Sequence, residues 1–112
     1  MGNQKQHVLA QLMAVIEDRK ANPPAKSYTT TLLAGGVPKI GEKVREEADE
    51  VIEAAGESGE DGRSHLICEA ADLIYHLFVM LGHRGVKLAE VEAELAERFG
   101  ISGLDEKASR TK

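Results

Sequence analysis

Residues 66–81, LICEAADLIYHLFVML, decide the fold of this chain, because nearly every residue in the stretch is apolar or small. This pattern predicts an α-helix that is buried on most of its sides. The helix is expected to run from about His65 to His83, with Ser64 as its N-cap and a glycine ending it at position 82 or 85. Its longest uncharged run, Leu73–Leu81, is too short to cross a bilayer, which argues against a membrane protein.

Three further segments on either side have apolar residues at helical spacing, and no stretch alternates with the period of a strand. Pro23 and Pro24 must end the first segment, and Pro38 suits the first turn of the second. The predicted helices are 4–20, 38–55 and 88–99, and the connections are a loop over 25–36, with room for one turn at 30–34, and a polar turn over 56–62. The prediction is an all-α, four-helix bundle, whose last helix turns Leu88, Val91, Leu95 and Phe99 inward.

Composition narrows the possible functions. A chain of 112 residues, 42% hydrophobic and 29% charged, is expected to form one soluble domain over 1–112, with 1–3 and 103–112 loosely ordered. A net charge of −5 and only 4% aromatic residues argue against a nucleic-acid partner. The single cysteine, Cys68, excludes an internal disulfide, and the N-terminal residues lack the apolar core of a signal peptide. These features predict a cytoplasmic protein.

Five acidic residues on the two central helices stand out. Glu69 and Asp72 lie one turn apart on the apolar helix, where unpaired charges are costly. If the helices pack antiparallel, these two acids approach three others on the preceding helix, Glu46, Glu47 and Glu50. So many carboxylates in one crevice repel, and a hard divalent cation removes the conflict. Oxygen ligands without cysteine favour Mg²⁺, with Mn²⁺ as the alternative.

Each of these residues also has an ordinary structural interpretation. The acids of the second helix alone could form a solvated face, and Lys39 and Lys43 could pair with neighbouring acids. His76 and Tyr75 could be packing residues, and Cys68 a small core hydrophobe. The joint spacing, Glu-Glu-x-x-Glu followed by Glu-x-x-Asp, is much harder to obtain by accident than either half.

This joint motif resembles the signature of the all-α nucleoside triphosphate pyrophosphohydrolases of the MazG type, and within them the phosphoribosyl-ATP pyrophosphohydrolases of histidine biosynthesis. The resemblance covers most of the chain from Ser27 onward. Its segments are SYT (27–29), GGVPKIGEKVREEADEVIEAA (35–55), EAADLIYHL (69–77), RGV (84–86) and SGLDEKASR (102–110). It implies hydrolysis of phosphoribosyl-ATP to phosphoribosyl-AMP and pyrophosphate, with Mg²⁺ held by the five acids, one of which takes the proton.

Five further residues are candidates for supporting roles beside the acids. Lys39 and Lys43 are candidates for phosphate contact, and Tyr28, Tyr75 and His76 for orienting the substrate or the acids. The family resemblance also implies a homodimer, in which the apolar helix contributes to the intersubunit core and the tail from Ser102 reaches the partner; the residues expected there are Leu73, Leu77, Met80 and Leu81.

Three alternatives stay open at the level of sequence. One is a related enzyme that acts on another nucleoside or deoxynucleoside triphosphate. A second is a ferritin-like di-iron bundle, which requires Glu-x-x-His on two helices; here Glu69 is followed by Asp72 at that spacing, and His76 comes four residues later. The third is a helical interaction module whose acids are only solvated.

Overall fold

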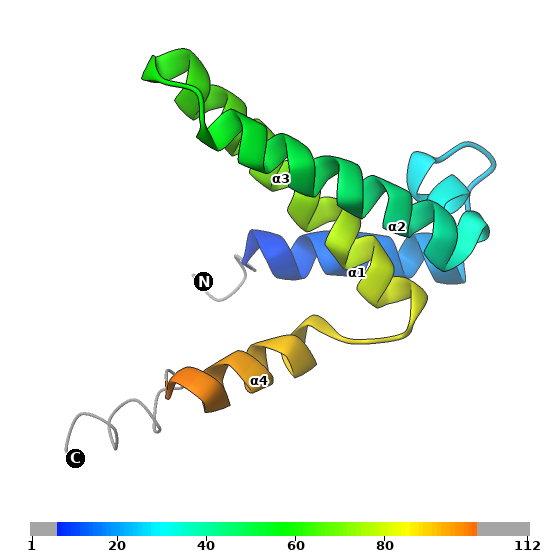
Figure 1. Cartoon of the computed structure of the whole chain (residues 1–112). Coiled ribbons are helices and arrows are strands. Elements are labelled where there is room, and N and C mark those ends of the chain that lie inside the picture. Colours follow the sequence, from blue (N-terminus) through cyan, green and yellow to red (C-terminus); the bar gives the residue numbers. More distant parts are fainter. Residues whose placement is uncertain (1–6, 101–112) are drawn as a thin grey trace.

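The computed structural model describes residues 7–100 and contains four α-helices and no strand within that range. The helices are α1 (Val8–Ala21), α2 (Tyr28–Ala55), α3 (Gly59–His83) and α4 (Leu88–Phe99). Figure 1 shows α2 and α3 side by side as a long hairpin, with α1 crossing them and α4 at the far end of α3. The all-α prediction is confirmed. The expectations for a helix start at Gln4, for loose ends at 1–3 and 103–112, and for the tail from Ser102 lie outside the described residues.

The hairpin turn is shorter than the sequence predicts, because α3 begins at Gly59 with Ser58, rather than Ser64, as its N-cap residue. Glu60 and Asp61 occupy the first turn, where negative charge favours the positive end of the helix. Gly62 is buried against the turn, and a Cβ there would lie only 2.6 Å from the carbonyl oxygen of Glu57. The predicted polar turn over 56–62 is therefore wrong in its second half.

The predicted loop over 25–36 is wrong in its extent, because the helical turn expected at 30–34 is part of a longer helix that Ser27 caps. Its side chain accepts a hydrogen bond from the backbone N–H of Thr30 at 3.2 Å, which caps the first turn of α2. Helical backbone continues to Gly36, where φ is 71° and ψ is −165°, and then resumes with Pro38 in the first turn of the second half. α2 is thus two helical segments joined at a glycine break.

The core lies where α1 crosses the α2–α3 hairpin. Its fully buried side chains are Ile16, Leu32, Ile40 and Val79. At the crossing, α1 and α3 touch closely: a Cβ on Gly82 would lie 2.9 Å from Cγ2 of Ile16. Next to it, Lys20 donates hydrogen bonds to the carbonyl oxygens of Gly82 and His83, at 3.0 and 3.1 Å, and so satisfies the end of α3.

Helix α4 has the predicted bounds but not the predicted burial. None of its residues is buried, Leu95 is 44% exposed and Phe99 is 68% exposed. Only Leu88, at its start, packs against the core cluster. Within residues 7–100, the second half of the apolar stripe expected from the sequence is therefore left uncovered.

Helix α3 is long and apolar enough to cross a membrane by length and composition, and only 22% of its most apolar window is buried. The same helix carries Glu69 and Asp72 in its middle, which would be costly in a bilayer. Its exposed apolar residues are Ile67, Ile74 and Leu77. Helix α3 packs along α2 on one side and has apolar residues exposed on another. This pattern is typical of a core helix that is incompletely covered.

Candidate active site

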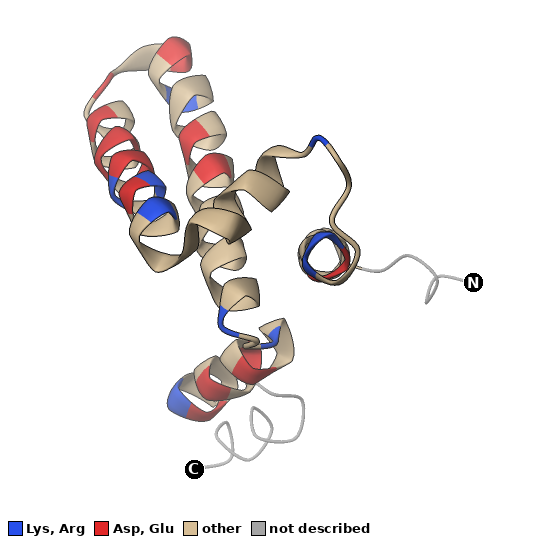
Figure 2. Cartoon of the chain, turned by 90° about the vertical axis from the view of Figure 1, so that its right-hand side faces the viewer, with Lys and Arg blue, Asp and Glu red and all other residues tan. Residues whose placement is uncertain are grey.

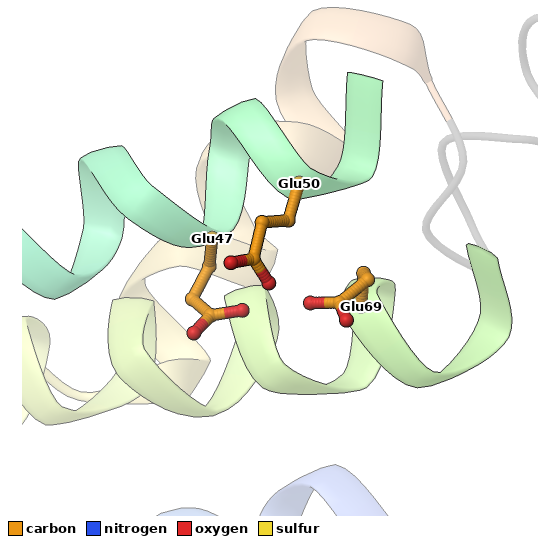
Figure 3. A group of neighbouring side chains, drawn as sticks. All are labelled: Glu47, Glu50 and Glu69. Carbon is orange, nitrogen blue, oxygen red and sulfur yellow. The ribbon is translucent and has the colours of Figure 1, made fainter. Parts of the chain in front are cut away.

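Three glutamates meet between α2 and α3. Glu47 and Glu50 project from α2 toward Glu69 on α3 (Figure 3), and one carboxylate oxygen from each lies within 4.8 Å of the others. Figure 2 shows acidic positions on both arms of the hairpin. The antiparallel packing expected from the sequence thus brings acids from both halves of the motif together.

Two oxygen atoms in this group lack any partner. Oε1 of Glu47 and Oε1 of Glu69 are buried and accept no hydrogen bond, and the Glu47 residue is only 8% exposed. A buried carboxylate oxygen with no donor costs free energy unless a cation or a proton reaches it. Hard oxygen ligands in a group without cysteine match Mg²⁺ or Mn²⁺. The residues present therefore fit a divalent cation.

The remaining two acids of the motif lie outside this group of three. Glu46 is exposed and forms an ion pair with Lys43, with 3.0 Å between Nζ and Oε1. Asp72 is also exposed, one turn along α3 from Glu69. The structure thus brings the buried Glu47, the exposed Glu50 and the half-buried Glu69 together and leaves Glu46 and Asp72 outside this group.

Repulsion within the group acts on Glu50. The pKa of its carboxyl group is raised from the usual value, first because it shares a hydrogen bond with Glu69 and then because of the negative charge on that residue. Two carboxylates this close to each other favour a positively charged partner between them.

The three aromatic candidates for substrate orientation form a second cluster beside the acids. The ring centroids of Tyr75 and His76 lie 4.9 Å apart. The ring centroid of Tyr28 lies 6.2 Å from that of Tyr75 and 5.8 Å from that of His76. Nδ1 of His76 lies 2.8 Å from the backbone carbonyl oxygen of Asp72, which can only accept, so Nδ1 carries a proton. In the neutral ring Nε2 then accepts from the Tyr28 hydroxyl at 2.9 Å. Tyr75 hydrogen-bonds Thr29.

This hydrogen bonding assigns His76 an internal role. It is 5% exposed, and both ring nitrogens are engaged, so neither is free to bind iron as a ferritin-like site would require. Tyr28, in contrast, is 52% exposed. Of the three aromatic residues, Tyr28 is the one best placed to contact a bound molecule.

Lys43 connects the two clusters. It interacts electrostatically with Tyr28, and its hydrogen bond to Glu46 raises the pKa of its ammonium group. The pKa of Tyr28 is raised chiefly by burial, although the charge on Lys43 acts in the opposite direction. Lys39 is exposed, and its aliphatic stem lies against Gly35. Of the two lysines, Lys43 is tied to the site.

One pair of residues at the site was not assigned a role from the sequence. His65 on α3 places Nδ1 3.0 Å from Oε1 of Glu57 and Nε2 3.3 Å from Oε2 of Glu69. The pKa of His65 is raised, first by its hydrogen bond to Glu57. The spacing of His65 and Glu69 on one helix could have revealed their contact, but Glu57 lies beyond the turn and leaves no periodic signal.

The structure is all-α, and acids from both halves of the motif meet between two antiparallel helices. This is the arrangement expected of the class that the motif indicates, the all-α pyrophosphohydrolases. Residues 9–99 match the family model for phosphoribosyl-ATP pyrophosphohydrolase. The chain belongs to this family.

Similar curated proteins carry the name phosphoribosyl-ATP pyrophosphatase. The one from Rhodopirellula baltica is 57% identical over 91% of this chain and 85% of its own length. Those from Dinoroseobacter shibae and Trichlorobacter lovleyi are 53% and 49% identical, over 92% and 96% of this chain and 98% and 97% of theirs. The similarity extends over nearly the whole chain rather than over the acidic motif alone.

Proposed function

We propose that this chain hydrolyses phosphoribosyl-ATP to phosphoribosyl-AMP and pyrophosphate, as an enzyme of histidine biosynthesis in the cytoplasm that acts as a single domain over residues 1–112. Membership of the family supports this activity. The observation that carries it is the match of residues 9–99 to the family model, and the buried, unpartnered oxygens on Glu47 and Glu69 support a cation site within it. The three glutamates lower the stability of the fold, as residues that serve a function often do. Binding a cation that neutralises a polyphosphate substrate would be such a function.

The five acids fall into two sets, the three whose oxygens lie within 4.8 Å of one another and the two outside that group. Glu47, Glu50 and Glu69 would hold Mg²⁺ directly, and Glu46 and Asp72 would complete its surroundings from the exposed edge. Mn²⁺ could replace it, since the same oxygen ligands suit both ions. When bound, the ion would neutralise phosphate charge and make water at the site a stronger nucleophile.

The chain itself would supply positioning and proton transfer. Hydrolysis of a phosphoanhydride needs oriented phosphates, an attacking water and a base within hydrogen-bond reach. One of the five carboxylates would take the proton. Lys43 would approach the phosphates, with Lys39 one turn before it on the same helix. Tyr28 would contact the substrate, while Tyr75 and His76 would fix its ring and hydroxyl.

The enzyme is further proposed to be a homodimer. The exposed apolar residues of α3 and α4 need cover that residues 7–100 of one chain do not provide, and pairing across a two-fold axis would supply it. Leu77 and the half-buried Leu73 remain in the proposed interface, whereas Met80 and Leu81 already pack partly against their own core. Ile67 and Ile74 extend the same side of α3.

Pyrophosphate release tests the activity. The purified chain should release pyrophosphate from phosphoribosyl-ATP when Mg²⁺ is present and not when it is chelated. The common nucleoside and deoxynucleoside triphosphates, assayed side by side, should be poor substrates. Equal or faster turnover of one of them would transfer the assignment to the related triphosphate enzymes, and no turnover of any would leave a helical interaction module.

A further inference from the structure

His65 joins two carboxylates across the hairpin turn. Its ring lies between Glu57, which follows the end of α2, and Glu69, one turn further along α3. The Nδ1 contact is a hydrogen bond of 3.0 Å, and the Nε2 contact is 3.3 Å. A ring fixed at both nitrogens has little freedom to rotate, so it presents Nε2 to Glu69 in a set direction.

The contact uses one oxygen of Glu69 and leaves the other for the site. His65 meets Oε2, whereas Oε1 is buried without a partner. Figure 3 shows the Glu69 carboxylate turned toward Glu50. The side chain of Glu69 is 13% exposed, so water competes little for its oxygens. Fixing Oε2 therefore orients the whole carboxylate, because its two oxygens move together.

We propose that His65, anchored by Glu57, is a positioning residue that holds Glu69 in the orientation needed to bind the divalent cation. The inference rests on the proposed function, since it assumes that Glu69 is a metal ligand. Hydrogen-bonding partners of metal-binding carboxylates commonly set ligand orientation in this way. The role extends the site beyond the acidic motif to the turn between α2 and α3.

An alternative explanation is that the pair is only a surface ion pair. His65 has 38% of its side chain exposed and Glu57 has 47%, and contacts of this kind often contribute little. The two explanations predict opposite changes in cation affinity when the His65 side chain is removed. Removing a positively charged imidazole should strengthen cation binding through charge alone, whereas loss of positioning should weaken it.

Titration of the metal-free protein with Mn²⁺, followed by electron paramagnetic resonance, separates them without any turnover. His65→Ala should weaken Mn²⁺ binding about tenfold, the lower end of the usual effect of removing such a partner. His65→Gln keeps an N–H donor near the position of Nε2 and should stay within about threefold of wild type. Circular dichroism of each variant checks that it is folded.

Two control variants measure the effect of charge alone. Arg63→Ala removes a positive charge from an exposed position two residues away and should leave Mn²⁺ binding unchanged or slightly tighter. Glu57→Ala should weaken binding more than Glu60→Ala, because Glu60 carries the same charge in the first turn of α3 without anchoring His65.

The outcomes can be told apart. Unchanged or tighter Mn²⁺ binding by His65→Ala would overturn the positioning role while leaving the metal site intact. Equal loss in His65→Gln and His65→Ala would overturn the hydrogen-bond basis. If wild type itself bound no Mn²⁺, the proposed metal site would fail, and the role of His65 with it.

Discussion

Glu50 of α2 and Glu69 of α3 approach each other across the hairpin with ligand oxygens no more than 4.8 Å apart. Two carboxylates at this distance cannot both be charged without a cost, which a proton or a cation relieves. The pKa of Glu50 is raised accordingly. The repulsion between α2 and α3 therefore includes this Glu50–Glu69 contact, which single substitutions can alter.

Glu50→Gln should stabilise the metal-free protein at pH 7. Because the pKa of Glu50 is raised in the folded chain, its ionisation opposes folding above that pKa. Protonation removes the penalty as the pH falls through the raised pKa toward the usual 4.5, so the difference in melting temperature should shrink over that window. Thermal melts in EDTA between pH 4 and 8 measure it. Glu53→Gln is the control, and an equal gain there would contradict the explanation.

Mg²⁺ should raise the melting temperature of the wild type. A ligand that binds only the folded state stabilises it by about 2.7 kcal/mol at one hundred times its Kd. Glu47→Gln and Glu69→Gln should each reduce this shift, because each removes a charge from the group of three. Differential scanning fluorimetry over a Mg²⁺ series is sufficient. A flat response up to millimolar metal would count against the site.

Asp72→Asn and Glu50→Gln should abolish turnover while leaving the fold intact. An acid that serves a cation stabilises the fold little, so its neutral amide can be accommodated. Pyrophosphate release and circular dichroism, measured on the same preparations, check both halves of the statement. Asp49→Asn, at an exposed position of α2, is the control. Near-normal activity in Asp72→Asn would remove that residue from the site.

Gly82→Ala should destabilise the fold by about 1–3 kcal/mol, as inserting a methyl group into a packed contact does. The new Cβ would lie 2.9 Å from Ile16, which is fully buried and cannot move aside. Gly41→Ala is the matched control, because its Cβ would meet Met80 at an ordinary 3.9 Å. Urea unfolding compares the two. Equal stability of both variants would show that α1 and α3 can separate at the crossing without cost.

Leu77→Glu should dissociate the proposed dimer. A charge on the apolar side of α3 would have to be buried in the interface without a partner. Ile52→Glu, on the exposed side of α2, changes the surface in the same way outside that interface. Sedimentation at micromolar concentration should show a wild-type dimer, a monomeric Leu77→Glu and a dimeric Ile52→Glu. A folded wild-type monomer with full activity would refute the dimer.

The sequence predicts the long helices from their periodic apolar residues, but it does not predict where α2 and α3 begin. The bounds of α4 and the meeting of acids from α2 and α3 follow from helical spacing and a short connection. The start of α3 at Gly59 depends on tight packing of Gly62 against Glu57, which no periodicity reports. The helix that begins at Tyr28 depends on one serine side chain. Both starts involve local contacts that leave no periodic signal in the sequence.

The sequence also predicts more burial on α4 than the structure shows. An apolar stripe shows that a helix face needs cover, but not which surface supplies it. Leu95 and Phe99 are exposed because the core ends at Leu88. Their spacing indicates a buried face, and the part of the chain that the structure describes does not provide one.

The break at Gly36 also determines how far Tyr28 lies from the acids. In an unbroken helix, Tyr28 and Glu47 would be separated by about 28 Å along the axis, at 1.5 Å per residue. The two residues instead interact electrostatically, and Tyr28 reaches His76 in the middle of α3. Because φ at Gly36 is 71°, any other side chain there is strained. A residue with no side chain therefore sets the distance between Tyr28 and the acids in the proposed substrate site, and substitutions at position 36 should behave as active-site mutations.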